Sequence, residues 1–123
     1  MHSHIQQLFD IAAKPSRKVI GLMSGTSLDG LDVALCELCG DGLDTGIRLL
    51  QFTTVDYAAD YKQRVKAVFS KRDVDLQAVT LLNPWIGIEH GRMINQCLEQ
   101  WQLKASDVDI IASHGQTIFH NAD

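Results

Sequence analysis

The stretch that decides the fold is Val19-Ile20-Gly21-Leu22-Met23-Ser24-Gly25-Thr26-Ser27-Leu28-Asp29-Gly30-Leu31-Asp32. It opens with five apolar residues, 19–23, two of them β-branched, which is typical of a strand. A second apolar run follows at 31–38, and the polar residues between the two runs include glycines. We therefore predict two strands, 19–23 and 31–38, joined by a turn at residues 24–30.

A third strand and a helix follow this pair. Residues 47–55 come after the turn Gly40-Asp41-Gly42 and end in strongly strand-forming residues, so the first three strands are predicted to form an antiparallel meander. From residue 57 the apolar residues recur at helical spacing, with lysine and arginine left for solvent. This pattern predicts a helix over 57–71.

A second helix is predicted from Asp75, which can cap it, to Trp101. Pro84 must kink or restart this helix, because proline lacks the backbone N–H and clashes with the preceding turn. Gly87 and Gly91 lie four residues apart on one face, which favours close backbone packing over a ligand contact.

The last predicted strand is Asp109–Ser113, a short strand of the buried type that runs into a polar loop at 114–117. Three strands, two helices and a strand predict an α/β fold, a mixed sheet with flanking helices. A buried strand reached through a helical crossover normally has further strands or helices over it. We therefore expect an N-terminal part of a longer chain, with residues 1–18 as a leader segment.

Composition narrows the class of protein. The 123 residues carry a formal net charge of −4, so the basic surface on which nucleic-acid binders depend is missing. No apolar run approaches the roughly 20 residues that a membrane span needs, and the N-terminus lacks the pattern of a secretory signal. Three cysteines cannot all pair, and 46% hydrophobic residues can build a core without disulfides. We expect a cytoplasmic protein with reduced thiols and with neither a nucleic-acid nor a membrane partner.

The turn at 24–30 carries residues that suit a phosphate. Glycines let backbone N–H groups approach an anion, and Thr26 and Ser27 can donate hydrogen bonds to phosphate oxygens. Asp29 or Asp32 could hold a magnesium ion, directly or through water. The turn is not a Walker loop, because no lysine follows the glycines. An ordinary hairpin turn, stabilised by Asx and Ser/Thr hydrogen bonds, fits the spacing equally well.

A second polar group, Ser113-His114-Gly115-Gln116-Thr117, follows the last strand at its carboxyl end. Sheets flanked by helices usually bind ligands at that end. A histidine and an amide there can bond sugar hydroxyls or orient a water molecule. The alternative is that His114 satisfies a nearby backbone group.

Two pairs with metal-binding side chains are interpreted as structural. Cys36 and Cys39 are three residues apart on a predicted strand, so their thiols point to opposite faces of the sheet. Cys97 and His90 lack a close-spaced cluster of further ligands. We therefore expect no metal site at either pair.

The two polar motifs together resemble one family. Residues 20–32 are similar to the opening strand and phosphate loop of the bacterial anhydro-N-acetylmuramic acid kinases. The family's second signature is similar to Ile111-Ala112-Ser113-His114-Gly115-Gln116-Thr117-Ile118-Phe119-His120. The resemblance covers residues 19–120, with the middle supported by pattern alone. It implies the ribonuclease-H-like fold shared by sugar kinases, actin and Hsp70, with 19–123 as a partial N-terminal kinase domain.

The resemblance also implies a reaction and a site. The reaction is ATP-dependent: water opens the 1,6-anhydro ring of anhydro-N-acetylmuramic acid and O6 is phosphorylated, giving N-acetylmuramic acid 6-phosphate in cell-wall recycling. The ATP phosphates would lie on Gly25, Thr26, Ser27, Leu28, Asp29, Gly30, Leu31 and Asp32. Mg²⁺ would bind Asp29 or Asp32, and the amino sugar would bind near His114, Gln116 and Thr117. Much of the superfamily has an aspartate where this sequence has Met23, so the metal ligand stays open.

The family's general base is an aspartate that we expect beyond Asp123. Because a kinase cleft needs both lobes to exclude water, we expect this chain alone to be inactive. The last strand should lack cover and drive the chain to form a homo-oligomer. The alternative function is a non-catalytic fragment, or a binding or dimerisation module that retains the fold.

Overall fold

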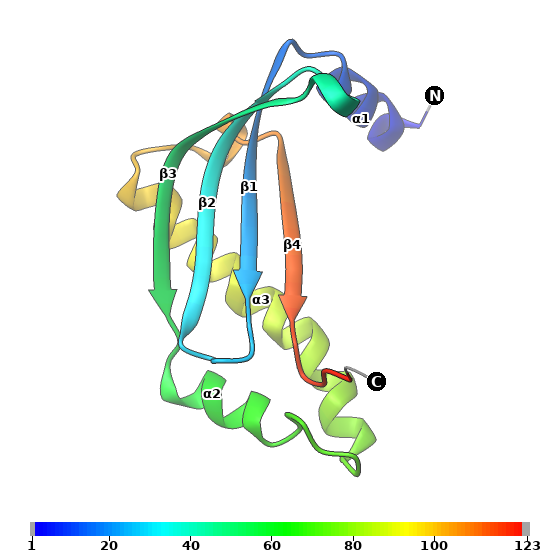
Figure 1. Cartoon of the computed structure of the whole chain (residues 1–123), viewed down its shortest axis with the longest axis vertical. Helices are drawn as coiled ribbons and strands as arrows, with labels where there is room; N and C mark the ends of the chain where they lie inside the picture. The colour runs from blue at the N-terminus through cyan, green and yellow to red at the C-terminus, as the bar shows by residue number, and fades with distance from the viewer. Residues whose placement is uncertain (1, 122–123) are drawn as a thin grey trace.

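Four strands form one mixed sheet in the order β3-β2-β1-β4 (Figure 1). β1 pairs with β2, and β2 with β3, in antiparallel fashion, whereas β4 lies parallel to β1. The predicted meander and mixed sheet are confirmed. In this computed structural model, which describes residues 2–121, the strands are β1 (Ser16–Ser24), β2 (Gly30–Cys39), β3 (Gly46–Asp56) and β4 (Ile110–Gln116).

The helices lie at three places around the sheet. α3 (Leu76–Gln100) crosses one face, and α2 (Ala59–Lys66) lies at the end of the sheet where β1, β3 and β4 finish (Figure 1). α1 (Ser3–Ala12) lies at the opposite end, and short 3₁₀ turns occupy Gly42–Asp44 and Ala105–Asp107. None of the helices within residues 2–121 combines the length and the apolar character that a membrane span requires.

The core lies between the sheet and α3. Alternate residues of β1 and β2 are buried, as expected for strands with one covered face. They pack in one cluster with the inner face of α3. The cluster includes Ile20 and Leu22 of β1, Leu31, Val33 and Leu35 of β2, and Met93, Ile94, Cys97 and Leu98 of α3.

The first predicted helix is shorter than its apolar pattern. The pattern covers 57–71, but α2 spans only Ala59–Lys66. Its start is delayed because the backbone N–H of Tyr57 donates to the carbonyl of Asp29, in the β1–β2 turn. After its end, Ser70 adopts a left-handed φ of 55° and donates its N–H to the carbonyl of Ile118.

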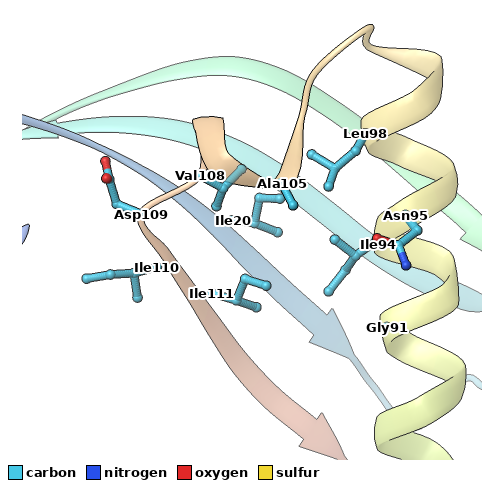
Figure 2. Close-up of a pocket in the computed structure, with 10 residues that line it drawn as sticks. All are labelled: Ile20, Gly91, Ile94, Asn95, Leu98, Ala105, Val108, Asp109, Ile110 and Ile111. Carbon is cyan, nitrogen blue, oxygen red and sulfur yellow. The ribbon is translucent and has the colours of Figure 1, made fainter. Parts of the chain in front are cut away.

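The second predicted helix is confirmed as one element, α3, with Pro84 inside it. Of the two alternative effects predicted for the proline, a kink or a restart, the restart is not observed. The close packing predicted at Gly87 and Gly91 is wrong, because a Cβ built on either residue meets no atom within 4 Å. Gly91 instead lines an apolar cleft between α3 and β4, into which Ile94 and Ile111 point (Figure 2).

β4 is also exposed where a buried strand was predicted. It is one of the two outer strands of the sheet, and its residues 110–114 are exposed. The side chain of Ile111 is 52% exposed although its neighbour on β1, Ile20, is fully buried. The expected lack of cover over the last strand is therefore confirmed. The strand also extends to Gln116, so part of the predicted loop is strand.

Candidate functional site

The turn between β1 and β2 is closed by two residues that face the protein. Leu28 has a positive φ of 56° and places its side chain in the core. At Gly30 a Cβ would lie 2.6 Å from the carbonyl oxygen of Val55, so this close approach to β3 requires glycine. The turn is therefore held from inside at two points, and it spans residues 25–29, one residue shorter at each end than predicted.

The residues between these anchors are open to ligands. Thr26, Ser27 and Asp29 are exposed, and Gly25 is half-buried. Leu31, like Leu28, is buried in the core, so these two predicted phosphate-loop residues can offer only their main chain.

Asp32 stands beside the turn on β2. Its cross-strand partner is Met23, so the two side chains share the sheet face opposite the core. One carboxylate oxygen, Oδ1, accepts a hydrogen bond of 2.7 Å from Thr54 Oγ1. A carboxylate is therefore present beside Met23, on the neighbouring strand.

The end of β4 is brought beside the turn by an irregularity in the sheet. Leu22 pairs with Ser113, but Ser24 pairs with Gln116, so β4 has one extra residue at this point. Gly115 has a φ of 80°, in the left-handed region that glycine adopts without strain. This bulge aligns Gln116 with Ser24, the last residue of β1.

Gln116 joins the two motifs directly. Its side-chain Nε2 donates to the carbonyl of Gly25 at 3.3 Å and to that of Thr117 at 3.0 Å. Its Oε1 accepts from Ser24 Oγ at 2.6 Å and from Tyr61 Oη at 2.8 Å. One amide side chain thus connects the glycine-containing turn to the second polar motif.

Three residues that sequence reasoning did not assign to the site complete this arrangement. Tyr57 Oη donates to Ser24 Oγ at 2.5 Å, and His90 Nε2 lies 3.0 Å from Tyr61 Oη and 3.3 Å from Tyr57 Oη. The tyrosine rings are stacked with centroids 3.8 Å apart. We call Ser24, Tyr57, Tyr61, His90 and Gln116 the buried polar network.

The only sequence signal for these residues was the spacing of the two tyrosines, four apart in a helical pattern, and that spacing also suits plain core packing. His90 is interpreted from the sequence only as a structural residue, together with Cys97, and its position in a long helix gives no signal for this network. Its partners come from α2 and from the segment before it, so only the packing of α3 against them reveals its role.

Burial sets the charge state of the network. His90 is only 5% exposed, and burial lowers its pKa below the usual 6.5, so the ring is neutral at pH 7. Burial also raises the pKa of Tyr61 far above its usual value, with the hydrogen bond to Tyr57 as a second cause. His90 is therefore neutral at pH 7, and Tyr61 keeps its proton.

The other two residues predicted to bind the substrate, His114 and Thr117, lie outside the buried polar network. His114 is exposed and Thr117 is half-buried. A cleft of about 370 Å³ opens beside them between α3 and the end of β4. It is lined by apolar Val79, Leu82, Ile86 and Ile118, by Gly87 and Gly115, and by polar Asn83, His90, Ser113 and Gln116.

The described chain, residues 2–121, contains no group of three or more histidine, cysteine or acidic side chains placed to share a metal ion. Cys36 is half-buried and Cys39 is exposed, both on β2, and Cys97 is buried in the core. None of the three is in a disulfide.

The fold and the site together define a class of protein. A meander of three strands, a helical crossover and a parallel fourth strand, with a turn rich in glycine and hydroxyl groups after the first strand, is the N-terminal arrangement of the actin-like ATPases, which have the ribonuclease-H-like fold. Residues 17–123 match the family described as anhydro-N-acetylmuramic acid kinase, and the chain belongs to this family.

Curated relatives carry the same name. The chain is 65% identical over 120 residues to an anhydro-N-acetylmuramic acid kinase of Pseudoalteromonas atlantica and 59% identical to one of Pseudoalteromonas translucida; each match covers 98% of this chain. It is 39% identical over 104 residues, 85% of this chain, to one of Francisella tularensis subsp. novicida. The matched segments are 30%, 30% and 27% of those relatives, so the chain spans less than a third of their length.

Proposed function

We propose that this chain is the phosphate-binding part of an ATP-dependent kinase acting on anhydro-N-acetylmuramic acid. In the proposed reaction water opens the 1,6-anhydro ring and O6 accepts the phosphoryl group, giving N-acetylmuramic acid 6-phosphate in cell-wall recycling. The observation that supports this most directly is the hydrogen bond of 2.6 Å between Ser24 and Gln116. It joins the two motifs at the carboxyl ends of β1 and β4. Sheets flanked by helices usually bind their ligands at the carboxyl ends of their strands.

The turn would hold the phosphates of ATP. Its exposed Thr26 and Ser27 can donate hydroxyl hydrogen bonds, and the main chain from Gly25 to Gly30 can supply N–H groups. Phosphoryl transfer depends mainly on positioning and on neutralising charge, which such donors provide.

Asp29 and Asp32 suit a magnesium ion. Asp29 is exposed, and Asp32 has Oδ1 bonded to Thr54 and is half-buried. Mg²⁺ usually keeps several waters and takes one or two carboxylates together with phosphate oxygens. When bound, it would neutralise charge on the phosphates. Asp32 is our favoured ligand, because it stands beside the turn on β2 and its carboxylate is held by the hydrogen bond from Thr54.

The amino sugar would bind at the end of β4. His114 and Thr117 can bond its hydroxyl groups, while Gln116, whose amide is committed to the turn, would hold the site in shape. The neighbouring cleft of about 370 Å³ is in the size range of small-molecule sites and combines apolar with polar lining. That mixture suits a sugar that carries an acetyl group and a lactyl ether.

The rest of the catalytic machinery belongs to the remaining length of the family's chains. We place the general-base aspartate beyond Asp123 and expect this chain by itself to give no turnover. We further propose that it acts in the cytoplasm and as a homo-oligomer, with no nucleic-acid and no membrane partner. The competing function is that of a non-catalytic binding or dimerisation module.

Nucleotide binding tests the proposal without requiring turnover. The ¹⁵N-labelled chain is titrated with MgATP, and we expect saturable shifts of the amide signals of residues 25–29. Thr26→Ala should weaken binding about tenfold or more, because a hydrogen bond to a charged group contributes roughly 1.5–3 kcal/mol. Asp29→Asn and Asp32→Asn, compared with and without Mg²⁺, identify the metal ligand.

The control is Thr45→Ala at the far end of the sheet. Thr45 is exposed and its hydroxyl bonds only the carbonyl of Gly42 in its own turn. A folded wild-type chain that gives no saturable shifts would refute the nucleotide site and leave the binding-module function. Equal losses in Thr26→Ala and Thr45→Ala would also contradict a specific role for the turn.

A further inference from the structure

The order of protons in the buried polar network follows from its geometry. The Gln116 amide nitrogen donates to two backbone carbonyls, so its oxygen must face the hydroxyl groups of Ser24 and Tyr61. Ser24 and Tyr61 both donate to that oxygen, and Tyr57 donates to Ser24. All three hydroxyl protons are thereby committed.

His90 must then be the donor to the tyrosines. With their protons committed, Tyr57 Oη and Tyr61 Oη can only accept from His90 Nε2, which lies 3.3 Å and 3.0 Å away. A neutral ring has one N–H, so this arrangement requires the tautomer with the proton on Nε2. No buried side-chain polar atom among residues 2–121 lacks a partner, so the network is fully satisfied.

We propose that Tyr57, Tyr61 and His90 are positioning residues that hold the Gln116 side chain in one orientation, and that Gln116 in turn ties the Gly25 end of the β1–β2 turn to the end of β4. This inference rests on the proposed function in one respect: the turn and the end of β4 are taken as the two halves of one ligand site. A site ordered before binding loses less entropy when the ligand arrives.

The geometry favours this role over simple core filling. Ser24 is fully buried at the last position of β1, and a serine there would not be needed to fill apolar space. The network takes one member from β1, one from the segment after β3, and one each from α2, α3 and β4. It therefore connects β1, α2, α3, β4 and the segment after β3, and its last link, from Gln116 to the carbonyl of Gly25, ends on the turn itself.

The test compares two substitutions of His90. His90→Gln keeps an N–H donor near the position of Nε2, whereas His90→Leu keeps bulk and removes the donor. On the ¹⁵N-labelled chain without nucleotide, we expect His90→Leu to lower the order parameters of Gly25, Thr26 and Ser27 from about 0.85 to below about 0.6. His90→Gln should restore them, and wild-type His90 should give the ¹⁵N signature of the Nε2–H tautomer.

A matched control separates positioning from loss of stability. Cys97→Ala changes another buried side chain of α3, but Cys97 is outside the network. It should lower the thermal midpoint and leave the order of the turn unchanged. If His90→Leu does not fold, Tyr61→Phe takes its place, because it removes one hydroxyl group from the network. The order parameters of the turn are measured on it in the same way.

Three results would overturn the inference: turn order in His90→Leu equal to that of wild type, no rescue by His90→Gln, or a wild-type ring protonated on Nδ1. MgATP titration of the same samples keeps the two proposals apart. A wild-type chain that binds no MgATP refutes the nucleotide site, whereas the order of the turn, measured without nucleotide, still decides the positioning role. If MgATP binds, His90→Leu should weaken it about tenfold, and His90→Gln should recover most of that loss.

Discussion

Gly30 is the position of the β1–β2 turn at which a side chain has the least space. It begins β2, and its backbone lies so close to β3 that a Cβ would come within 2.6 Å of Val55 O and 2.9 Å of Thr54 Cγ2. The first of these neighbours is backbone and cannot move independently. The sequence showed a glycine in a polar turn, but its cause, the approach of the third strand, is tertiary.

We expect Gly30→Ala to destabilise the chain by about 1–3 kcal/mol, the usual cost of overpacking. Gly21→Ala is the control, because Gly21 lies in the neighbouring strand β1 and a Cβ there meets nothing within 4 Å. Urea unfolding followed by circular dichroism measures both. Equal midpoints for the two variants would show that β3 can move away at no cost.

At the scale of elements, the parallel pairing of β4 with β1 begins at Asp109. Its carboxylate accepts from Lys14 Nζ and from the backbone N–H of Lys18, and its own N–H donates to the Lys18 carbonyl. The hydrogen bond from Lys14 and then that from Lys18 lower the pKa of Asp109 below its usual 3.8. This one side chain joins the segment after α1, strand β1 and the start of β4.

The pH dependence of this junction has a definite sign. Because the pKa of Asp109 is lower in the folded than in the unfolded chain, its stabilisation is fully present above about pH 4 and is lost as pH falls through the folded pKa. We expect Asp109→Asn to lower stability at pH 7 by about 1 kcal/mol, since Lys14 is half exposed and screened by solvent.

Urea unfolding of both forms at pH 7 and at pH 2.5 checks this prediction. The difference between the wild type and Asp109→Asn should shrink as the pH is lowered from 7 to 2.5, because protonation of the wild-type carboxylate removes the charge that Asn also lacks. A difference that stayed constant between the two pH values would mean that the charge of Asp109 contributes nothing.

At the scale of the whole molecule, the most unusual feature is the open side of β4. Residues 110–114 are exposed, and the apolar cleft of about 370 Å³ beside them is lined by Ile94, Ile111 and their neighbours (Figure 2). An exposed edge strand with an apolar flank is a template for pairing with another chain. The proposed homo-oligomer would use this edge.

We expect the sedimentation coefficient of the wild-type chain to rise with concentration and Ile111→Lys to suppress that rise. Ile5→Lys is the matched control, because Ile5 on α1 is 57% exposed against 52% for Ile111. Sedimentation velocity over a hundredfold range of concentration measures the effect. A wild-type chain that stays monomeric, or equal suppression by both variants, would contradict the use of the β4 edge.

Much of this molecule could be predicted from sequence because its signals are local. The apolar runs predicted four strands and the meander, Asp75 predicted the start of α3, where it accepts the N–H of Gln77, and the motif at 24–30 predicted a turn. The two polar motifs, read together, identified the family to which the chain belongs. Periodicity, capping and turn chemistry act within a few residues, so a sequence records them directly.

Only the tertiary structure decided how these parts meet. Tyr57, Tyr61 and His90 looked like core residues in two helical patterns, and their hydrogen bonds arise because α2 and α3 pack at the same edge of the sheet. Gly115 became a bulge that aligns Gln116 with Ser24, and Gly87 and Gly91 became cleft lining rather than packing contacts. The physical reason is range: hydrogen bonds between residues up to 95 positions apart depend on the register of strands and the placement of helices, which no local pattern encodes.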